Sequence, residues 1–182
     1  MTENKKHPPL VWLDLEMSGL DPDSERIIEI ATVITNENLE EIIEGPNLVI
    51  KQSQEIIDGM DEWNTNQHSN SGLIDCIKVS QISEIEAEQQ TLDFLKKHSK
   101  KGKSPLCGNS ISHDRRFLNR YMPELANFFH YRNIDVSSIK ELVKRWKPNF
   151  IEAAEKKGIH RAMADVYESI EELKFYKENI FK

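Results

Sequence analysis

The sequence contains little cysteine and no long apolar run. Its 182 residues include only Cys76 and Cys107, which are too few and too far apart to predict a disulfide-rich scaffold or a cysteine-ligated metal site. No stretch approaches the roughly 18 apolar residues that a membrane-spanning helix needs, and the polar residues 1–9 lack the apolar core of a secretory signal. A reducing cytoplasm is therefore the expected location.

Basic residues are also scarce relative to acidic ones. The chain has 24 Lys+Arg against 31 Asp+Glu, a formal net charge of −7. A protein that grips long nucleic acid usually presents a basic surface, because contacts to phosphates release counterions. Either nucleic acid is not the substrate, or only a few phosphates are held at a local site. The length and the ordinary composition predict a single domain spanning residues 1–182.

Apolar patterning predicts a mixed α/β domain. Strands are expected at residues 10–15, 26–35, 39–50 (interrupted at Gly45 and Pro46), 104–108 and 133–136. Helices are expected at residues 83–98, 113–121, about 137–146 and about 161–178. The first helix has the best signature, because Ser83 and Glu86 form a capping-box pair, and Ile85, Leu92 and Leu95 can share an apolar stripe. Three early strands followed by helices alternating with short strands favour an α/β fold.

Two carboxylates stand at the end of the first expected strand. Asp14 and Glu16 are separated by one residue, so their side chains project from the same face. Two acids beside an apolar strand repel each other unless a cation lies between them. The alternative is a strand end that emerges into solvent, where acids are common.

Two more acids begin expected helices. Asp114 ends the segment NSISHD and would lie in a first helical turn, where it could hold a metal or only stabilise the helix N-terminus. Asp165 ends the segment HRAMAD. Five helical residues turn about 140° beyond a full circle, so His160 must lie on the loop before the helix if it is to converge with Asp165.

Together these residues suit phosphodiester hydrolysis. Four carboxylates carry the charge that two divalent cations balance, and two such ions can stabilise the attacking and leaving oxygens together. Carboxylate oxygens favour Mg²⁺ or Mn²⁺. A histidine, whose ordinary pKa is about 6.5, could take a proton from the attacking water near neutral pH.

The same segments carry a family resemblance. Asp14-Leu15-Glu16 and residues 109–114 and 160–165 resemble the three motifs of the DEDDh exonuclease superfamily. WLDLEMSGLDPDSERIIEIATVIT, MDEWNTNQHSNSGL, CGNSISHDRRFL and FFHYRNIDVSSIKEL resemble the oligoribonuclease family, with a core at about residues 11–176. The resemblance implies a ribonuclease-H-like exonuclease fold with a mixed five-stranded sheet flanked by helices. It also implies a homodimer that uses two divalent metal ions, Mn²⁺ or Mg²⁺, to hydrolyse RNA of two to about five residues to 5′-mononucleotides.

The resemblance also implies residue roles. The metal ligands would be Asp14, Glu16, Asp114 and Asp165, and the general base would be His160. Leu20 and Trp63 would contact the bases, although Leu20 could instead pack on Met17 or Pro22 and Trp63 could be a core residue. The terminal phosphate would be surrounded by Ser110, Arg132, Ser137 and Lys140. The partner subunit would supply His130, Tyr131 and Arg132, with Tyr131 in the active site.

Two departures from the family pattern and two other functions remain open. Ala164 replaces an acidic residue that commonly precedes the last aspartate. His113, beside Asp114, is unexpected; it could add a titratable neighbour to Asp114, although it is expected to face solvent. A DNA proofreading exonuclease of the same superfamily would share the catalytic residues. A catalytically silent RNA-binding module is a different alternative, but it gains little from four mutually repelling carboxylates.

Overall fold

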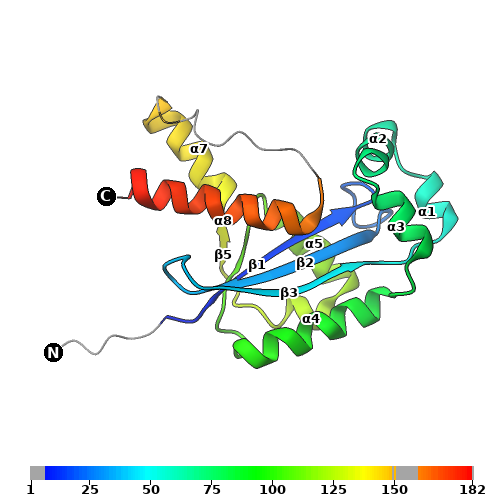
Figure 1. Cartoon of the computed structure of the whole chain (residues 1–182), viewed down its shortest axis with the longest axis horizontal. Helices are drawn as coiled ribbons and strands as arrows, with labels where there is room; N and C mark the ends of the chain where they lie inside the picture. Colours follow the sequence, from blue (N-terminus) through cyan, green and yellow to red (C-terminus); the bar gives the residue numbers. More distant parts are fainter. Residues whose placement is uncertain (1–6, 149, 151–159, 182) are drawn as a thin grey trace.

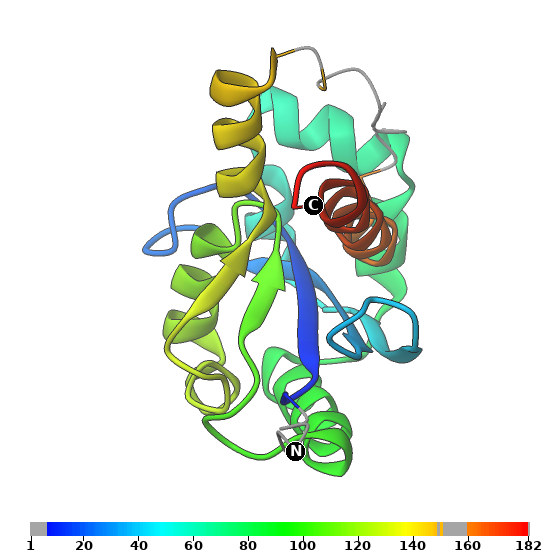
Figure 2. The same ribbon diagram turned by 90° about the vertical axis from the view of Figure 1, so that its left-hand side faces the viewer.

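The computed structural model describes residues 7–148, 150 and 160–181. A five-stranded sheet with the order β3-β2-β1-β4-β5 forms its centre. The strands are β1 (Leu10–Met17), β2 (Ile27–Thr35), β3 (Ile42–Val49), β4 (Leu106–Gly108) and β5 (Asn133–Asp135). The first three pair antiparallel. Strands β4 and β5 run parallel to β1, and the arrows of β4 and β5 point the same way in Figure 2. The expected α/β class with a mixed five-stranded sheet is confirmed.

Helices cover both faces of this sheet (Figure 1). They are α1 (Gln54–Asp58), α2 (Glu62–Asn70), α3 (Leu73–Val79), α4 (Glu84–His98), α5 (Ser112–Tyr121), α6 (Pro123–Ala126), α7 (Val136–Trp146) and α8 (Ala162–Asn179). One core cluster joins the sheet to α4, α5 and α6, and a second joins it to α7 and α8. In the described part of the chain, no helix is both long and apolar enough to cross a bilayer.

Strand β1 divides its side chains between these two cores. Val11, Leu13 and Leu15 belong to the core on the α4 side, whereas Trp12 belongs to the core under α8. Successive strand residues point to opposite faces, so Asp14 and Glu16 share the face of Trp12. The alternation in the sequence therefore directs both acids toward α8.

The expected break at Gly45 and Pro46 does not divide β3. The strand continues from Ile42 to Val49, and the pairing shifts register between Ala31 and Val33 on its neighbour. Because β3 is an edge strand and this point is a bulge, a proline is tolerated there. Gly45 allows Phe94 to pack closely on β3, since a Cβ atom at this position would lie 2.4 Å from Phe94 Cε1 and the ring would have to shift.

Helix α4 has the predicted capping box at Ser83 and Glu86. The predicted apolar stripe is wrong at Ile85, whose side chain is 77% exposed. The buried residues of this helix are Ala87, Thr91, Leu92 and Leu95, so Ile85 lies at the margin of the face that meets the sheet.

Candidate active site

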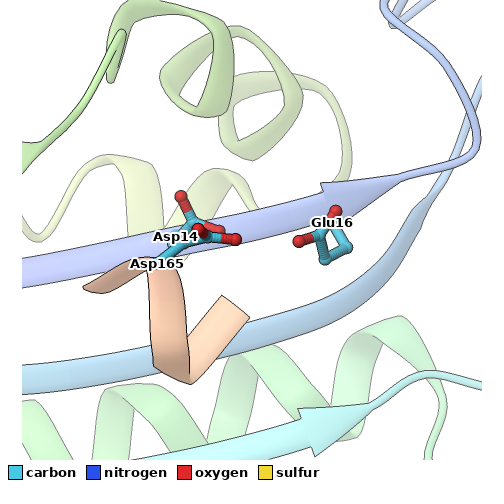
Figure 3. A group of neighbouring side chains, drawn as sticks. All are labelled: Asp14, Glu16 and Asp165. Atoms are coloured by element: carbon cyan, nitrogen blue, oxygen red, sulfur yellow. The ribbon is translucent and has the colours of Figure 1, made fainter. Parts of the chain in front are cut away.

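Three of the four predicted acids converge beside the end of β1. Asp14 and Glu16 extend from β1, and Asp165 extends from the first turn of α8 (Figure 3). One carboxylate oxygen of each lies within 4.8 Å of the others. All three side chains are half-buried. Such a group of hard oxygen atoms is suited to a divalent cation.

Asp114 occupies a different position next to this group. It lies in the first turn of α5 and is 5% exposed. Its Oδ1 accepts a hydrogen bond of 2.9 Å from the backbone N–H of Leu15, the residue between Asp14 and Glu16. The structure therefore places Asp114 against the backbone of β1, and its oxygen atoms are not among the three that meet.

His160 lies directly before α8, as its spacing from Asp165 required. Its φ angle of 47° is in the left-handed region, which is uncommon for residues other than glycine. Its ring meets the ring of Trp63 edge to face, with 6.2 Å between centroids and an interplanar angle of 80°. The histidine therefore lies outside the helix and next to an aromatic side chain from α2.

Burial and like charge perturb two of these acids. Burial raises the pKa of Glu16 to about 8, and the nearby carboxylates of Asp165, Glu29 and Asp114 add to the increase. Burial likewise raises the pKa of Asp114 to about 7, although the hydrogen bond from Leu15 opposes it. Both shifts arise mainly from burial, with neighbouring carboxylates as the smaller cause. A divalent ion would balance the negative charge, so these carboxylates fit a metal site.

The metal-free protein should lose stability as the pH rises. Between pH 4.5 and about 8, folded Glu16 keeps a proton that the unfolded chain has released, so the free energy of unfolding decreases across this window. Mn²⁺ at 100 times its Kd should restore about 2.7 kcal/mol at pH 8, or about 5–10 °C in Tm for a chain of this length. Thermal unfolding with EDTA or Mn²⁺ from pH 5 to pH 8 measures both effects. A Tm that changes with neither pH nor Mn²⁺ concentration would contradict the assignment of a metal site.

A cavity of about 540 Å³ opens above the carboxylates. It is lined by Asp14, Leu15, Glu16, Trp63, Asn109, Ser110, Ser137, His160, Asp165, Glu168 and Ser169. A second hollow of about 150 Å³ shares Trp63 and His160 with it and adds Leu20. Leu20 is 67% and Trp63 is 63% exposed. Trp63 is therefore not a core residue, and both apolar side chains are accessible at the entrance.

Ser110 and Ser137 line the cavity and are hydrogen-bonded to each other. The backbone N–H of Ser110 donates to Asp135 Oδ1 and to Ser137 Oγ, each at 3.0 Å. Ser137 Oγ in turn donates to Asn109 Oδ1 at 3.0 Å. Lys140 does not line this cavity; its Nζ forms an ion pair of 3.0 Å with the buried Glu172. Of the proposed phosphate-binding residues, the two serines therefore lie nearest the carboxylates.

His130, Tyr131 and Arg132 lie at the far end of the sheet in the same chain. The backbone N–H of His130 donates to Ser104 O at 2.8 Å, and Ser104 lies two residues before Leu106, the partner of Val11 in the parallel ladder. With a rise of about 3.3 Å per residue, that point lies roughly 16 Å along the sheet from Asp14. Tyr131 is exposed there and stacks obliquely on His130, with centroids 4.4 Å apart. These three residues do not reach the carboxylates of their own chain.

Sequence reasoning missed several buried polar groups around the site. Glu29 and Glu172 are buried carboxylates, and buried His68 contacts the Met17 carbonyl oxygen through Nε2 at 3.0 Å. A signal for Glu29 was available, because it is the one charged residue in the strand IIEIATVIT. His113 is exposed, as expected.

Comparisons with known proteins identify the fold and the family of the chain. Residues 11–173 match the family model RNase_T, described as exonuclease. Solved structures of exonuclease I share the fold: the enzyme from Methylocaldum szegediense has a TM-score of 0.68 at 18% identity, and the zinc-bound Escherichia coli enzyme with single-stranded DNA has 0.70 at 16%. The alignments to these two structures include 96% and 97% of this chain, respectively, but only 41% and 42% of the exonuclease I chains. The fold and the site thus define an exonuclease.

Curated relatives identify the family of this chain within the exonuclease class. The oligoribonuclease of Paraburkholderia xenovorans is 57% identical over 93% of this chain and 82% of its own length. Those of Shewanella loihica and Thiobacillus denitrificans are 54% and 53% identical, over 95% and 100% of this chain and 96% and 99% of their own lengths. The chain belongs to the oligoribonuclease family, a group of hydrolytic exoribonucleases within the exonuclease class.

Proposed function

We propose that this enzyme hydrolyses RNA of two to about five residues from the 3′ end and releases 5′-mononucleotides. The observation that carries the proposal is the meeting of Asp14, Glu16 and Asp165 within 4.8 Å, below a cavity that His160 also lines. The curated relatives named oligoribonuclease support the substrate class.

The carboxylates would hold two divalent cations, Mn²⁺ or Mg²⁺. Asp14, Glu16 and Asp165 offer converging oxygen atoms. Asp114 accepts a hydrogen bond from β1 through Oδ1, and its other oxygen would complete the proposed set of four ligands. Divalent cations bound there would stabilise the attacking and leaving oxygens of the phosphodiester together. The role of this chain's carboxylates is to fix the positions of those ions.

His160 would act as the general base. Its place on a loop at the cavity wall allows its ring to accept a proton from water, while α8 keeps Asp165 fixed beside it. The edge contact with Trp63 limits the orientations of the ring. Proton transfer by a positioned histidine contributes about 10²- to 10⁴-fold to rate.

The substrate would be held by a few side chains. Leu20 and Trp63 are exposed beside His160 and would contact the bases, and stacking on an aromatic ring contributes about 1–3 kcal/mol whatever the base. The terminal phosphate would contact Ser110 and Ser137. Lys140 would contribute from its pair with Glu172.

A second copy of the chain would complete this pocket. His130, Tyr131 and Arg132 lie roughly 16 Å along the sheet from Asp14 of their own subunit, so they do not join the carboxylates of that subunit in one catalytic centre. We therefore propose a homodimer in which these three residues reach the active site of the partner, with Tyr131 in the active site and Arg132 near the terminal phosphate. The guanidinium of Arg132 lies 5.0 Å from the Tyr131 ring centroid, so the two would approach together.

Hydrolysis should become slower as the RNA lengthens. The chain has a net charge of −7, so phosphates beyond the pocket gain little from counterion release. We expect kcat/KM to fall about tenfold or more between a dinucleotide and a decanucleotide. Product analysis on an RNA series from two to ten residues measures this.

The matched control for this series is DNA of the same sequences, together with a duplex that has a frayed 3′ end. Faster turnover of the frayed DNA would favour the proofreading alternative. Equal kcat/KM for a dinucleotide and a long RNA would contradict the preference for short substrates.

A further inference from the structure

Glu29 is a buried carboxylate on the same face of the sheet as the proposed metal ligands. It is 0% exposed and lies on β2 directly opposite Glu16 on β1. Cross-strand partners project to the same face, so Glu29 is a further acid beneath α8. A buried carboxylate costs considerable free energy unless it is paired and hydrogen-bonded.

Arg161 supplies that pairing from 132 residues away along the chain. Its Nε donates to both oxygens of Glu29 at 3.1 Å, and its Nη2 donates to Oε1 at 2.7 Å. This two-nitrogen arrangement is a strong and directional form of ion pair. The guanidinium of Arg161 thus balances the charge of Glu29, and both carboxylate oxygens of Glu29 accept hydrogen bonds from it.

Glu29 also caps α8. The helix begins at Ala162, and the capping residue Arg161 makes no side-chain cap hydrogen bond of its own. The backbone N–H of Ala162 instead donates to Glu29 Oε2 at 3.0 Å. The first N–H groups of a helix have no partner within the helix, and a negative charge there is favourable.

The residues on either side of this contact are those of the proposed chemistry. His160 precedes Arg161 and has the left-handed φ of 47°, a conformation that the surroundings must enforce. Asp165 follows in the first turn of α8, and its N–H donates to Arg161 O at 3.1 Å. Because residues 161 and 162 are attached to β2 through Glu29, the side chains of His160 and Asp165 are held in place relative to β1.

We propose that Glu29 is a positioning residue, which with Arg161 fastens the start of α8 to the sheet and so sets the places of His160 and Asp165. Glu29 itself contacts neither substrate nor cation. This inference rests on the proposed function, in which His160 and Asp165 act at one centre.

The test replaces Glu29 with glutamine, which keeps the shape and one acceptor oxygen but removes the charge. We expect kcat on a dinucleotide to fall about 10- to 100-fold, as for groups that orient metal ligands, with KM changed less than about threefold. Mn²⁺ binding, measured by calorimetry, should weaken about tenfold, because Arg161 then carries an unbalanced charge near Glu16. In the metal-free variant, the imidazole NMR signals of His160 should shift or broaden.

Two further variants make the result specific. Arg161→Lys keeps the positive charge but loses the two-nitrogen contact with Glu29. Its kcat should therefore lie between the values for Glu29→Gln and wild type. If Glu29→Gln fails to fold, Arg161→Lys provides the test of the positioning role. Asp93→Asn removes one carboxylate from an exposed pair with Lys96 on α4, against the other face of the sheet, and should match wild type throughout.

The outcomes separate the two proposals. A folded Glu29→Gln or Arg161→Lys protein with wild-type kcat, Mn²⁺ affinity and His160 signals would overturn the positioning role, and so would a loss of thermal stability alone. Failure of the wild-type protein to bind Mn²⁺ or to cleave a dinucleotide would instead overturn the proposed function.

Discussion

Asp14→Asn should abolish hydrolysis and leave the fold intact. The neutral amide offers a divalent cation a much weaker ligand than a carboxylate, and the loss should be on the order of 10³-fold or more in kcat. A carboxylate oxygen of Asp14 lies within 4.8 Å of one from Glu16 and one from Asp165. Removing the charge of Asp14 therefore also relieves repulsion in the metal-free protein. The Tm in EDTA should stay the same or rise. Turnover of a dinucleotide with Mn²⁺, together with thermal unfolding in EDTA, measures the two effects.

The same variant tests the shared active site. A subunit with Asp14→Asn lacks a metal ligand but keeps Tyr131, whereas a subunit with Tyr131→Ala has the opposite defect. In a mixed dimer, one of the two active sites would combine an intact Asp14 with an intact Tyr131 from the partner. Mixing the two inactive proteins should therefore restore part of the activity.

Differently tagged subunits allow the mixed dimer to be purified before it is assayed. Purified mixed dimers without activity would argue against residues shared across the interface. Wild-type turnover by Asp14→Asn alone would show that the assignment of the metal ligand is wrong.

His160→Ala should lower kcat by about 10²- to 10⁴-fold, the usual contribution of a positioned general base. The residue lies outside α8 and is only half-buried, so the substitution removes the edge contact with Trp63 without opening the core. Mn²⁺ affinity and Tm should change little. Single-turnover cleavage of a dinucleotide, followed across neutral pH, measures the loss.

His113→Ala is the matched control for this prediction. His113 neighbours Asp114 in sequence but is exposed on α5, so its removal should leave kcat unchanged. An unaltered rate in His160→Ala across neutral pH would refute the general-base role.

The fold was predictable where apolar side chains alternate or recur. Strand β1 shows this, because Val11, Leu13 and Leu15 face one core and Trp12 the other, which is also why Asp14 and Glu16 could be placed on one face. Helix α2 was not predictable in this way. Its buried residues are Asn64 and His68, so it lacks the apolar stripe by which a helix is read from sequence.

The convergence of Asp14, Glu16 and Asp165 was predictable from their placement, but the contacts of individual residues were not. Spacing alone required His160 to lie before the last helix, and it does. No local pattern could show that Asp114 would direct Oδ1 to the N–H of Leu15, because this contact joins residues 99 positions apart. The partnership of Glu29 with Arg161 depends in the same way on tertiary packing.

The bulge in β3 has a consequence for how the molecules behave in a crowded solution. An outermost strand offers its unused N–H and C=O groups to any neighbouring chain, and a flat row of them invites ordered aggregation. Here Pro46 has no backbone N–H to donate, and the shift in register between Ala31 and Val33 interrupts the regular spacing of the pairing. We therefore expect the β3 edge of the sheet to be a poor template for another copy of the chain.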